Sequence, residues 1–172
     1  YGDHRDLHSF LHDALPISDW LHPRRADWVS ELNRAVAADT RPAILIAHSL
    51  GCVTVAHWAA QAPLELLRRV RGALLVAPAD VERPGCPEPL RNFAPMPRDL
   101  LPFPSLLVGS DNDAAASALR AMELARAWGS EATILSGAGH INVKSGHRYW
   151  EQGFGYLYRL QSRIEQQSRL RA

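Results

Sequence analysis

Residues 43–52 read Ala-Ile-Leu-Ile-Ala-His-Ser-Leu-Gly-Cys, and this stretch decides the fold class. The apolar run Ala43–Ala47 is typical of a strand buried on both faces, and the residues from Gly51 to Gln61 are predicted to form a helix. A serine between a buried strand and a helix is the setting of a nucleophile elbow, a turn so sharp that the side chains two residues away must be small. Ala47 and Gly51 meet this requirement around Ser49, although glycine is the more common residue at the first position.

Strands and helices alternate along the rest of the chain. Short apolar runs predict further strands at residues 72–76, 105–109 and 132–135. The helical spacing of apolar residues predicts helices at residues 26–38 and 114–128, and a last helix towards the C-terminus that frays near Gly153 and Gly155. This alternation predicts an α/β domain in which a parallel sheet is flanked by helices.

One stretch of the chain is rich in proline. Eight of the twelve prolines lie between Pro78 and Pro104, so this segment is expected to follow an irregular, largely non-helical path. Because it connects two predicted parallel strands, it is expected near the carboxyl edge of the sheet, where open α/β sheets bind ligands. A purely structural excursion is equally compatible with the pattern.

Composition excludes several classes of protein. The 172 residues have a formal net charge of +1, which argues against nucleic-acid binding, since that function usually brings a strong basic excess. No apolar run approaches the roughly 20 residues that span a bilayer, which excludes an integral membrane protein. Cys52 and Cys86 are too few for a disulfide framework or a four-cysteine zinc site, so a cytoplasmic location is expected. Cys52 is predicted to be buried and Cys86 to be more accessible.

The first residues of the chain have an unusual pattern. His4, His8 and His12 recur at four-residue spacing with Asp residues between them, and on a helix they would share one face. Two such histidines with a carboxylate could bind zinc, whereas a solvated, poorly ordered terminus is the favoured interpretation. Residues 9–17 also resemble the translation of a sequencing-library adapter. Residues 1–18 are therefore interpreted as a doubtful or artefactual segment, and residues 19–172 as the folded domain.

A serine nucleophile needs a base to take its proton and a carboxylate to orient that base. Ser110-Asp111-Asn112-Asp113 follows one predicted strand and Gly137-Ala138-Gly139-His140 follows the next, in the chain order Ser, Asp, His. All these groups leave the same edge of the sheet, so they are expected to converge on Ser49. His140 is the predicted base. Either Asp111 or Asp113 is the acid, and the other is expected to cap the following helix.

Four strings carry a family resemblance: Leu45-Ile46-Ala47-His48-Ser49-Leu50-Gly51-Cys52, Arg71-Gly72-Ala73-Leu74-Leu75-Val76-Ala77-Pro78, Leu101-Pro102-Phe103-Pro104-Ser105 and Gly139-His140-Ile141-Asn142. Together they resemble the YdeN-type small α/β hydrolases, also called retinoblastoma-binding-protein-9-like serine hydrolases, from about residue 19 to residue 150. The resemblance implies Ser49 as the nucleophile and His140 as the base. The acid of the family stands in a Ser-x-x-Asp-Pro pattern, which selects Asp113, although Ala114 replaces the proline.

The front of the chain departs from this family. The family opens with a strand and a Pro-Gly-rich loop that offers one oxyanion-hole amide, and residues 16–20 match neither. The α/β-hydrolase fold is therefore expected to lack its first strand, which leaves Ala43–Ala47 as an apolar sheet edge. The amide of Leu50 remains as an oxyanion donor, and loss of the other lowers kcat by about 10²–10³. The chain is thus expected to behave as a poorly soluble, weakly active fragment.

These observations predict an esterase-like serine hydrolase that acts on small, neutral esters or amides through Ser49, Asp113 and His140, with no cofactor and no metal. His48 and His57 are expected to have structural roles. The alternative from another class is a non-catalytic binding module that uses the proline-rich segment for a protein partner, or an inactive fragment. Labelling with a fluorophosphonate distinguishes the two, because only an activated serine reacts.

Overall fold

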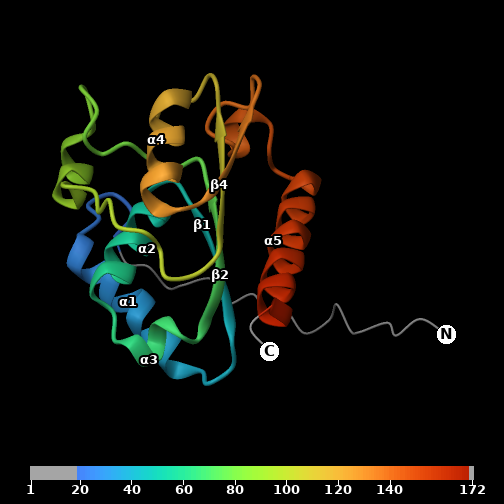
Figure 1. Cartoon of the computed structure of the whole chain (residues 1–172). Helices are drawn as coiled ribbons and strands as arrows, with labels where there is room; N and C mark the ends of the chain where they lie inside the picture. The colour runs from blue at the N-terminus through green and yellow to red at the C-terminus, as the bar shows by residue number, and fades with distance from the viewer. Residues whose placement is uncertain (1–18, 171–172) are drawn as a thin grey trace.

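A four-stranded parallel sheet with helices on both faces forms the body of the protein (Figure 1). The structure, a computed structural model, describes residues 19–170. Neighbouring strands are parallel and follow chain order across the sheet: β1 (Ala43–His48), β2 (Val70–Val76), β3 (Ser105–Ser110) and β4 (Glu131–Leu135). The helices are α1 (Arg25–Ala38), α2 (Leu50–Gln61), α3 (Leu64–Leu67), α4 (Ala118–Trp128) and α5 (Glu151–Leu170), with short 3-10 helices η2 (Glu88–Phe93) and η3 (Val143–Ser145).

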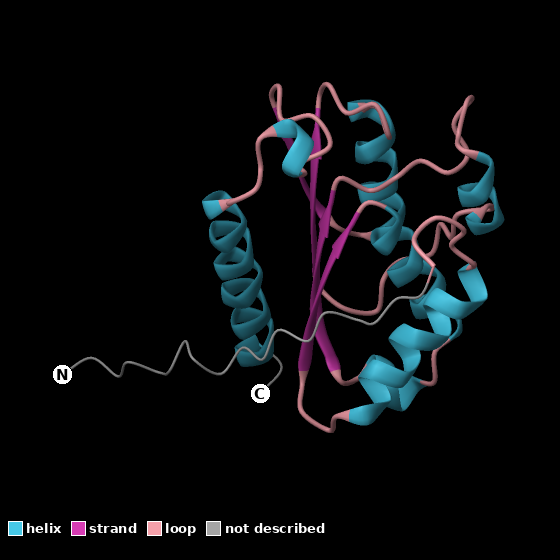
Figure 2. Ribbon diagram, turned by 180° about the vertical axis from the view of Figure 1, so that it is seen from behind, coloured by secondary structure: helices cyan, strands magenta, loops and turns pink. Residues whose placement is uncertain are grey.

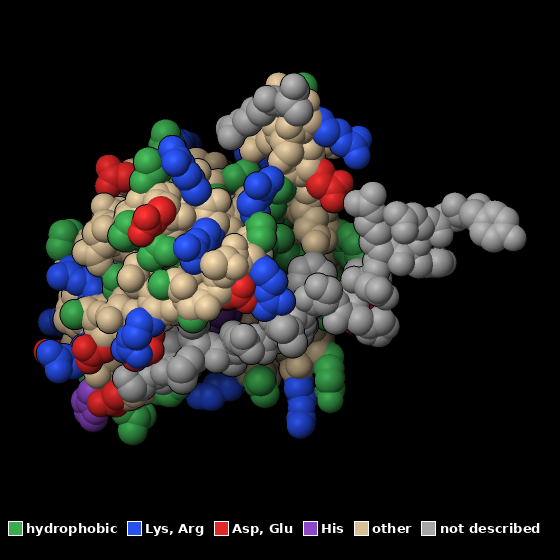
Figure 3. All heavy atoms as spheres, turned by 90° about the horizontal axis from the view of Figure 1, so that it is seen from below, with side chains coloured by type: hydrophobic (Ala, Val, Ile, Leu, Met, Phe, Trp, Pro, Cys, Tyr) green, Lys and Arg blue, Asp and Glu red, His purple; other side chains and the backbone are tan. Residues whose placement is uncertain are grey.

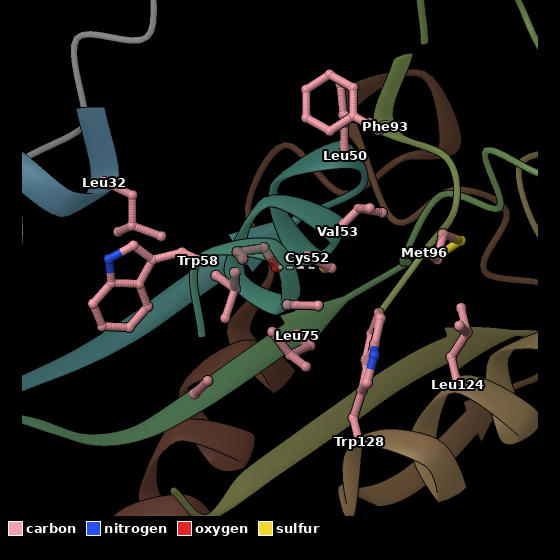
Figure 4. Close-up of a cluster of buried hydrophobic side chains, with 14 of the residues drawn as sticks. Leu32, Leu50, Cys52, Val53, Trp58, Leu75, Phe93, Met96, Leu124 and Trp128 are labelled. Atoms are coloured by element: carbon pink, nitrogen blue, oxygen red, sulfur yellow. Dashed lines mark hydrogen bonds between the residues drawn. The ribbon is translucent and has the colours of Figure 1, made fainter. Parts of the chain in front are cut away.

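The sheet has an apolar layer on each face because the side chains of its strands alternate. On one face, Leu75 and Leu107 lie in an apolar layer with side chains of α1, α2 and α4. Helix α5 packs on the other face, together with Ala138 and Ile141 from the segment after β4 (Figures 1 and 2). The first layer is dominated by large side chains that are almost completely buried, among them Trp58, Leu75, Phe93, Leu124 and Trp128 (Figure 4). The second contains Leu74, Val76, Leu106, Val108 and Leu160. Burial on both faces explains the uninterrupted apolar runs of the strands.

The predicted fold class is confirmed, and most element boundaries agree to within one or two residues. One helix begins later than expected, at Ala118 rather than near Ala114. Ser117 provides the N-cap, because its hydroxyl accepts a hydrogen bond from the amide of Arg120. The expectation that the last helix frays near Gly153 and Gly155 is wrong, since α5 continues through both residues without a break.

Strand β1 is an edge of the sheet that the described residues form, and it pairs only with β2 there. The side chain of Ile46 in this strand is 58% exposed, which agrees with the predicted apolar edge. The hypotheses on residues 1–18, including zinc binding by His4, His8 and His12, lie outside the described residues. Within residues 19–170 there is no group of three or more potential metal ligands, and no helix there is long and apolar enough to cross a membrane.

The proline-rich segment packs against the body of the protein. Phe93 and Met96 are buried in the same apolar layer as Leu50 and Val53 of α2 (Figure 4). The Nε2 of His57 donates a hydrogen bond to the carbonyl of Phe93 at 2.7 Å, which ties η2 to α2 and agrees with a structural role for this histidine. Seen from below, at the amino ends of the strands, basic and acidic side chains are interspersed on the surface (Figure 3).

Both cysteines are buried thiols with no disulfide between them. Cys52 is fully buried, as expected, and burial raises the pKa of its thiol. The expectation that Cys86 is more accessible is wrong, because its side chain is only 3% exposed and lies in the apolar layer with Phe93. The proline-rich segment is thus a packed excursion at this point rather than an exposed loop.

This burial predicts a slow reaction of the native protein with thiol reagents. Thiolate is the reactive form of cysteine, so a buried and protonated thiol reacts only after local or global unfolding. Titration with an aromatic disulfide under non-reducing conditions should detect little thiol in the native protein. Both thiols should react after unfolding in guanidinium chloride. A rapid reaction of one thiol in the native protein would contradict the buried position of Cys86.

Candidate active site

Ser49 occupies a strained turn between β1 and α2. Its backbone has φ 55° and ψ −119°, a conformation that residues other than glycine rarely adopt. A Cβ atom at Gly51 would lie 3.6 Å from the Cβ of Ala47, so larger side chains at these two positions would collide. The turn is held by backbone hydrogen bonds from the Ser49 amide to Val76 and from the Cys52 amide to Ser49. The geometry is that of the predicted nucleophile elbow.

Ser49, His140 and Asp113 are joined by hydrogen bonds although they come from three strand ends. The Oγ of Ser49 lies 2.8 Å from the Nε2 of His140. The Nδ1 of His140 lies 2.8 Å and 3.0 Å from the two carboxylate oxygens of Asp113. The Asp113 side chain is 2% exposed and that of His140 is 24% exposed. A buried carboxylate that accepts from Nδ1 leaves Nε2 free to accept the proton of the serine hydroxyl.

Asp111 and Asp113, the two candidates for the acid, have different hydrogen-bond partners. Only Asp113 contacts His140, whereas the Oδ1 of Asp111 accepts a hydrogen bond from the amide of Gly137 at 2.7 Å. The expectation that the other aspartate caps α4 is wrong, because Ser117 is the cap. Asp113 instead accepts from the amide of Ala115 at 2.7 Å, which fixes its carboxylate in a local turn.

Comparison with known proteins places this chain in a family. The model of the serine hydrolase family matches residues 6–159. The chain belongs to this serine hydrolase family. A structure described as a YdeN-like hydrolase, from Pectobacterium atrosepticum, is 31% identical with a TM-score of 0.72, over 86% of this chain and 74% of the other. The family predicted from sequence is therefore confirmed, and the protein is a hydrolase.

More distant structures share the fold of this serine hydrolase. BpoC of Mycobacterium tuberculosis, described as a non-heme bromoperoxidase, is 16% identical with a TM-score of 0.62, over 82% of this chain and 75% of the other. The esterase RhEst1 of Rhodococcus is 15% identical with a TM-score of 0.56, over 82% of this chain and 72% of the other. Among proteins with curated descriptions, none matches the chain.

His48 contacts the backbone of His140 in this serine hydrolase, and the sequence does not predict this contact. Its Nε2 donates a hydrogen bond to the backbone carbonyl of His140 at 2.8 Å, and the two rings meet edge to face with centroids 4.8 Å apart. Burial lowers the pKa of His48, so its imidazole is neutral at pH 7. The partners are 92 positions apart in the chain, and no local pattern indicates such a contact.

Leu50 is the first residue of α2 and directly follows Ser49. The first amides of a helix have no carbonyl partner within the helix, so the Leu50 amide is free to serve an external acceptor. The Leu50 side chain is buried and packs beside Phe93 (Figure 4). This packing anchors the start of α2, where an oxyanion formed at Ser49 would need a fixed donor.

Two hollows of the described surface lie away from these residues. One of about 470 Å³ is lined by residues at the start of α1 and in η2, including Arg25 and Asn92. The other, of about 360 Å³, is lined by a group of charged side chains that includes Asp80, Glu82 and Arg120. Neither is lined by Ser49, Asp113 or His140.

Proposed function

We propose that this serine hydrolase is an esterase-like enzyme that cleaves small, neutral esters or amides. Ser49 is the nucleophile, His140 the general base and then general acid, and Asp113 the carboxylate that orients His140. The amide of Leu50 donates to the oxyanion. One observation supports this assignment above the others: the unbroken hydrogen-bond path from Ser49 Oγ through the imidazole of His140 to the carboxylate of Asp113.

The proposed reaction proceeds in two halves. In acylation, the Oγ of Ser49 attacks the carbonyl carbon as its proton passes to Nε2 of His140, and the carbonyl oxygen becomes an oxyanion that accepts from the Leu50 amide. The bond to the leaving alcohol or amine then breaks, and His140 gives that group its proton. In deacylation, His140 takes a proton from water as the water oxygen attacks the acyl carbon. The bond from the acyl carbon to Ser49 Oγ then breaks, His140 returns its proton to Oγ, and the acid is released.

Asp113 keeps the base in the productive state during both halves. Its buried carboxylate accepts from Nδ1, so the neutral imidazole carries its proton there and offers a lone pair at Nε2. The imidazolium formed during attack is stabilised by the same carboxylate. The contact of Asp113 with His140, and of His140 with Ser49, favours turnover over the alternative of a non-catalytic binding module.

The proposal is tested by ester hydrolysis with the full chain. p-Nitrophenyl acetate should be hydrolysed with saturation kinetics, at a rate well above that of buffer. p-Nitrophenyl phosphate has the same leaving group but no acyl carbon, and it should give no turnover. A protein that is folded by circular dichroism and does not accelerate hydrolysis of the acetate, or of an acyl amide, would contradict the proposed function.

A further inference from the structure

The loop that carries His140 is held by side chains from other strand ends. Gly137 and Gly139 have φ of 66° and 57°, so this stretch after β4 is irregular. Three successive amides of this stretch donate to side chains at the end of β3 or directly after it. The Gly137 amide donates to Asp111 Oδ1 at 2.7 Å and the Ala138 amide to Ser110 Oγ at 3.0 Å. The Gly139 amide donates to Asn112 Oδ1 at 2.6 Å. The fourth group, the carbonyl of His140, accepts from His48.

Two of the three acceptors, Ser110 and Asn112, are bonded to each other, and the third, Asp111, is bonded to the loop alone. The Ser110 hydroxyl accepts from Ala138 and donates its own proton to Asn112 Oδ1 at 2.8 Å. Hydrogen bonds from the Gly137 amide and from the side chain of Ser136 lower the pKa of Asp111, so this acceptor is ionised at neutral pH. Ser110 is 1% exposed at the end of β3, where the sheet fixes it.

This set links the neighbours of the acid and of the base. Asn112 directly precedes Asp113, and Gly139 directly precedes His140, so the bond between them connects the two catalytic segments independently of the charge on Asp113. Packing holds two other points of this loop, because Ala138 and Ile141 are buried in the apolar layer that α5 covers. Gly139, which lies between them and directly before His140, has no side chain to pack, so its position depends on the hydrogen bond to Asn112.

We propose that Ser110, Asp111 and Asn112 are positioning residues that hold His140 in reach of Ser49; we call them the acceptor cradle. The inference rests on the proposed function and adds to it a set of residues that touch neither the substrate nor the reacting atoms. A misplacement of a catalytic group by about 1 Å can cost 10²-fold in rate. The cradle sets that placement through the backbone on the amino-terminal side of His140.

Asn112 and Asp111 are suited to a test because both are exposed. When either acceptor is removed, water can reach the freed amide, so folding should survive while the restraint on the loop is lost. Ser110 is less suitable, since its loss would leave the amide of the buried Ala138 without a partner. One variant is Asn112→Ala, which removes the acceptor of both the Gly139 amide and the Ser110 hydroxyl. The other is the exchange Asp111→Asn with Asn112→Asp, which keeps both acceptors and the net charge.

The experiment measures kcat and KM for p-nitrophenyl acetate, per active site titrated with a fluorophosphonate, across a range of pH. Asn112→Ala should lower kcat by about 10- to 100-fold with little change in KM, because attack is impaired and binding is not. The exchange variant should recover most of the loss. Glu65→Ala, which removes an exposed carboxylate from α3, is the control and should match the wild type.

The possible outcomes separate the cradle from the function on which it rests. A wild-type protein that reacts with neither ester nor fluorophosphonate overturns both. If the wild type turns over and Asn112→Ala has the same kcat per titrated site, only the cradle is overturned, even if the variant melts at a lower temperature. An exchange variant as slow as Asn112→Ala also overturns the cradle, because the acceptor oxygens would then not be what positions His140.

Discussion

Replacement of Ser49 by alanine should remove nearly all turnover of p-nitrophenyl acetate; in a serine hydrolase with a complete oxyanion hole, the same change lowers kcat by a factor on the order of 10⁶. Such a loss is expected because the Oγ of Ser49 forms the covalent bond to the acyl group, and it is the hydroxyl that lies against Nε2 of His140 within residues 19–170. The fold should be unchanged. Alanine is smaller than serine, and the positive φ at this turn strains the backbone of both residues equally.

The measurement compares initial rates and thermal unfolding of Ser49→Ala with those of Ser30→Ala. Ser30 is an exposed serine of α1, so its variant controls for the loss of a hydroxyl as such. We expect Ser30→Ala to have wild-type turnover and both variants to unfold near the wild-type temperature. Unchanged turnover in purified Ser49→Ala would show that another residue is the nucleophile.

Asp113→Asn should be the second most damaging change, with a loss in kcat on the order of 10⁴. The asparagine Oδ1 can still accept from the amide of Ala115, which leaves its NH₂ group directed at Nδ1 of His140. That donor favours the tautomer with the proton on Nε2, which cannot accept the proton of Ser49. The side chain remains the same size, so the change tests the charge and the acceptor rather than packing.

Asp111→Asn is the matched comparison, because it makes the same chemical change two positions earlier. Its Oδ1 remains an acceptor for Gly137, so we expect it to cost less than about tenfold in kcat, in line with a residue that acts only through the loop. Steady-state kinetics of the two variants side by side decide the assignment. If Asp111→Asn is the slower enzyme, the acid is Asp111 and the structure misassigns the pair.

Local sequence was sufficient for the framework of this protein. The sheet and the turn at Ser49 depend on short patterns, such as the apolar run before Ser49 and the small residues on either side of it, and the structure has a strand and a helix where these patterns predict them. The sequence predicts too early a start for α4, because residues 114–117 are three alanines and a serine and alanine strongly favours helix. The turn in which Asp113 accepts from Ala115 delays its start, and that turn serves the site.

The finer features of the site depend on contacts between distant parts of the chain. Asp111 and Asp113 are equivalent in local pattern, and the sequence preferred Asp113 only through its resemblance to a family. The sequence does not indicate that His48 and Asn112 bind the loop of His140, because the residues they contact are far away in the chain. Burial of Cys86 was missed for the same reason, because it depends on how the proline-rich segment packs against α2.

Mass spectrometry after reaction with a fluorophosphonate shows whether Ser49 is an activated nucleophile, as we propose. The proposed site predicts one adduct per chain, located by peptide mapping on Ser49, with no adduct when His140 is replaced by alanine. The reason is that only a serine whose proton can pass to a base attacks the probe. A folded protein that forms no adduct, or forms it at another residue while Ser49 stays unmodified, would contradict the claim.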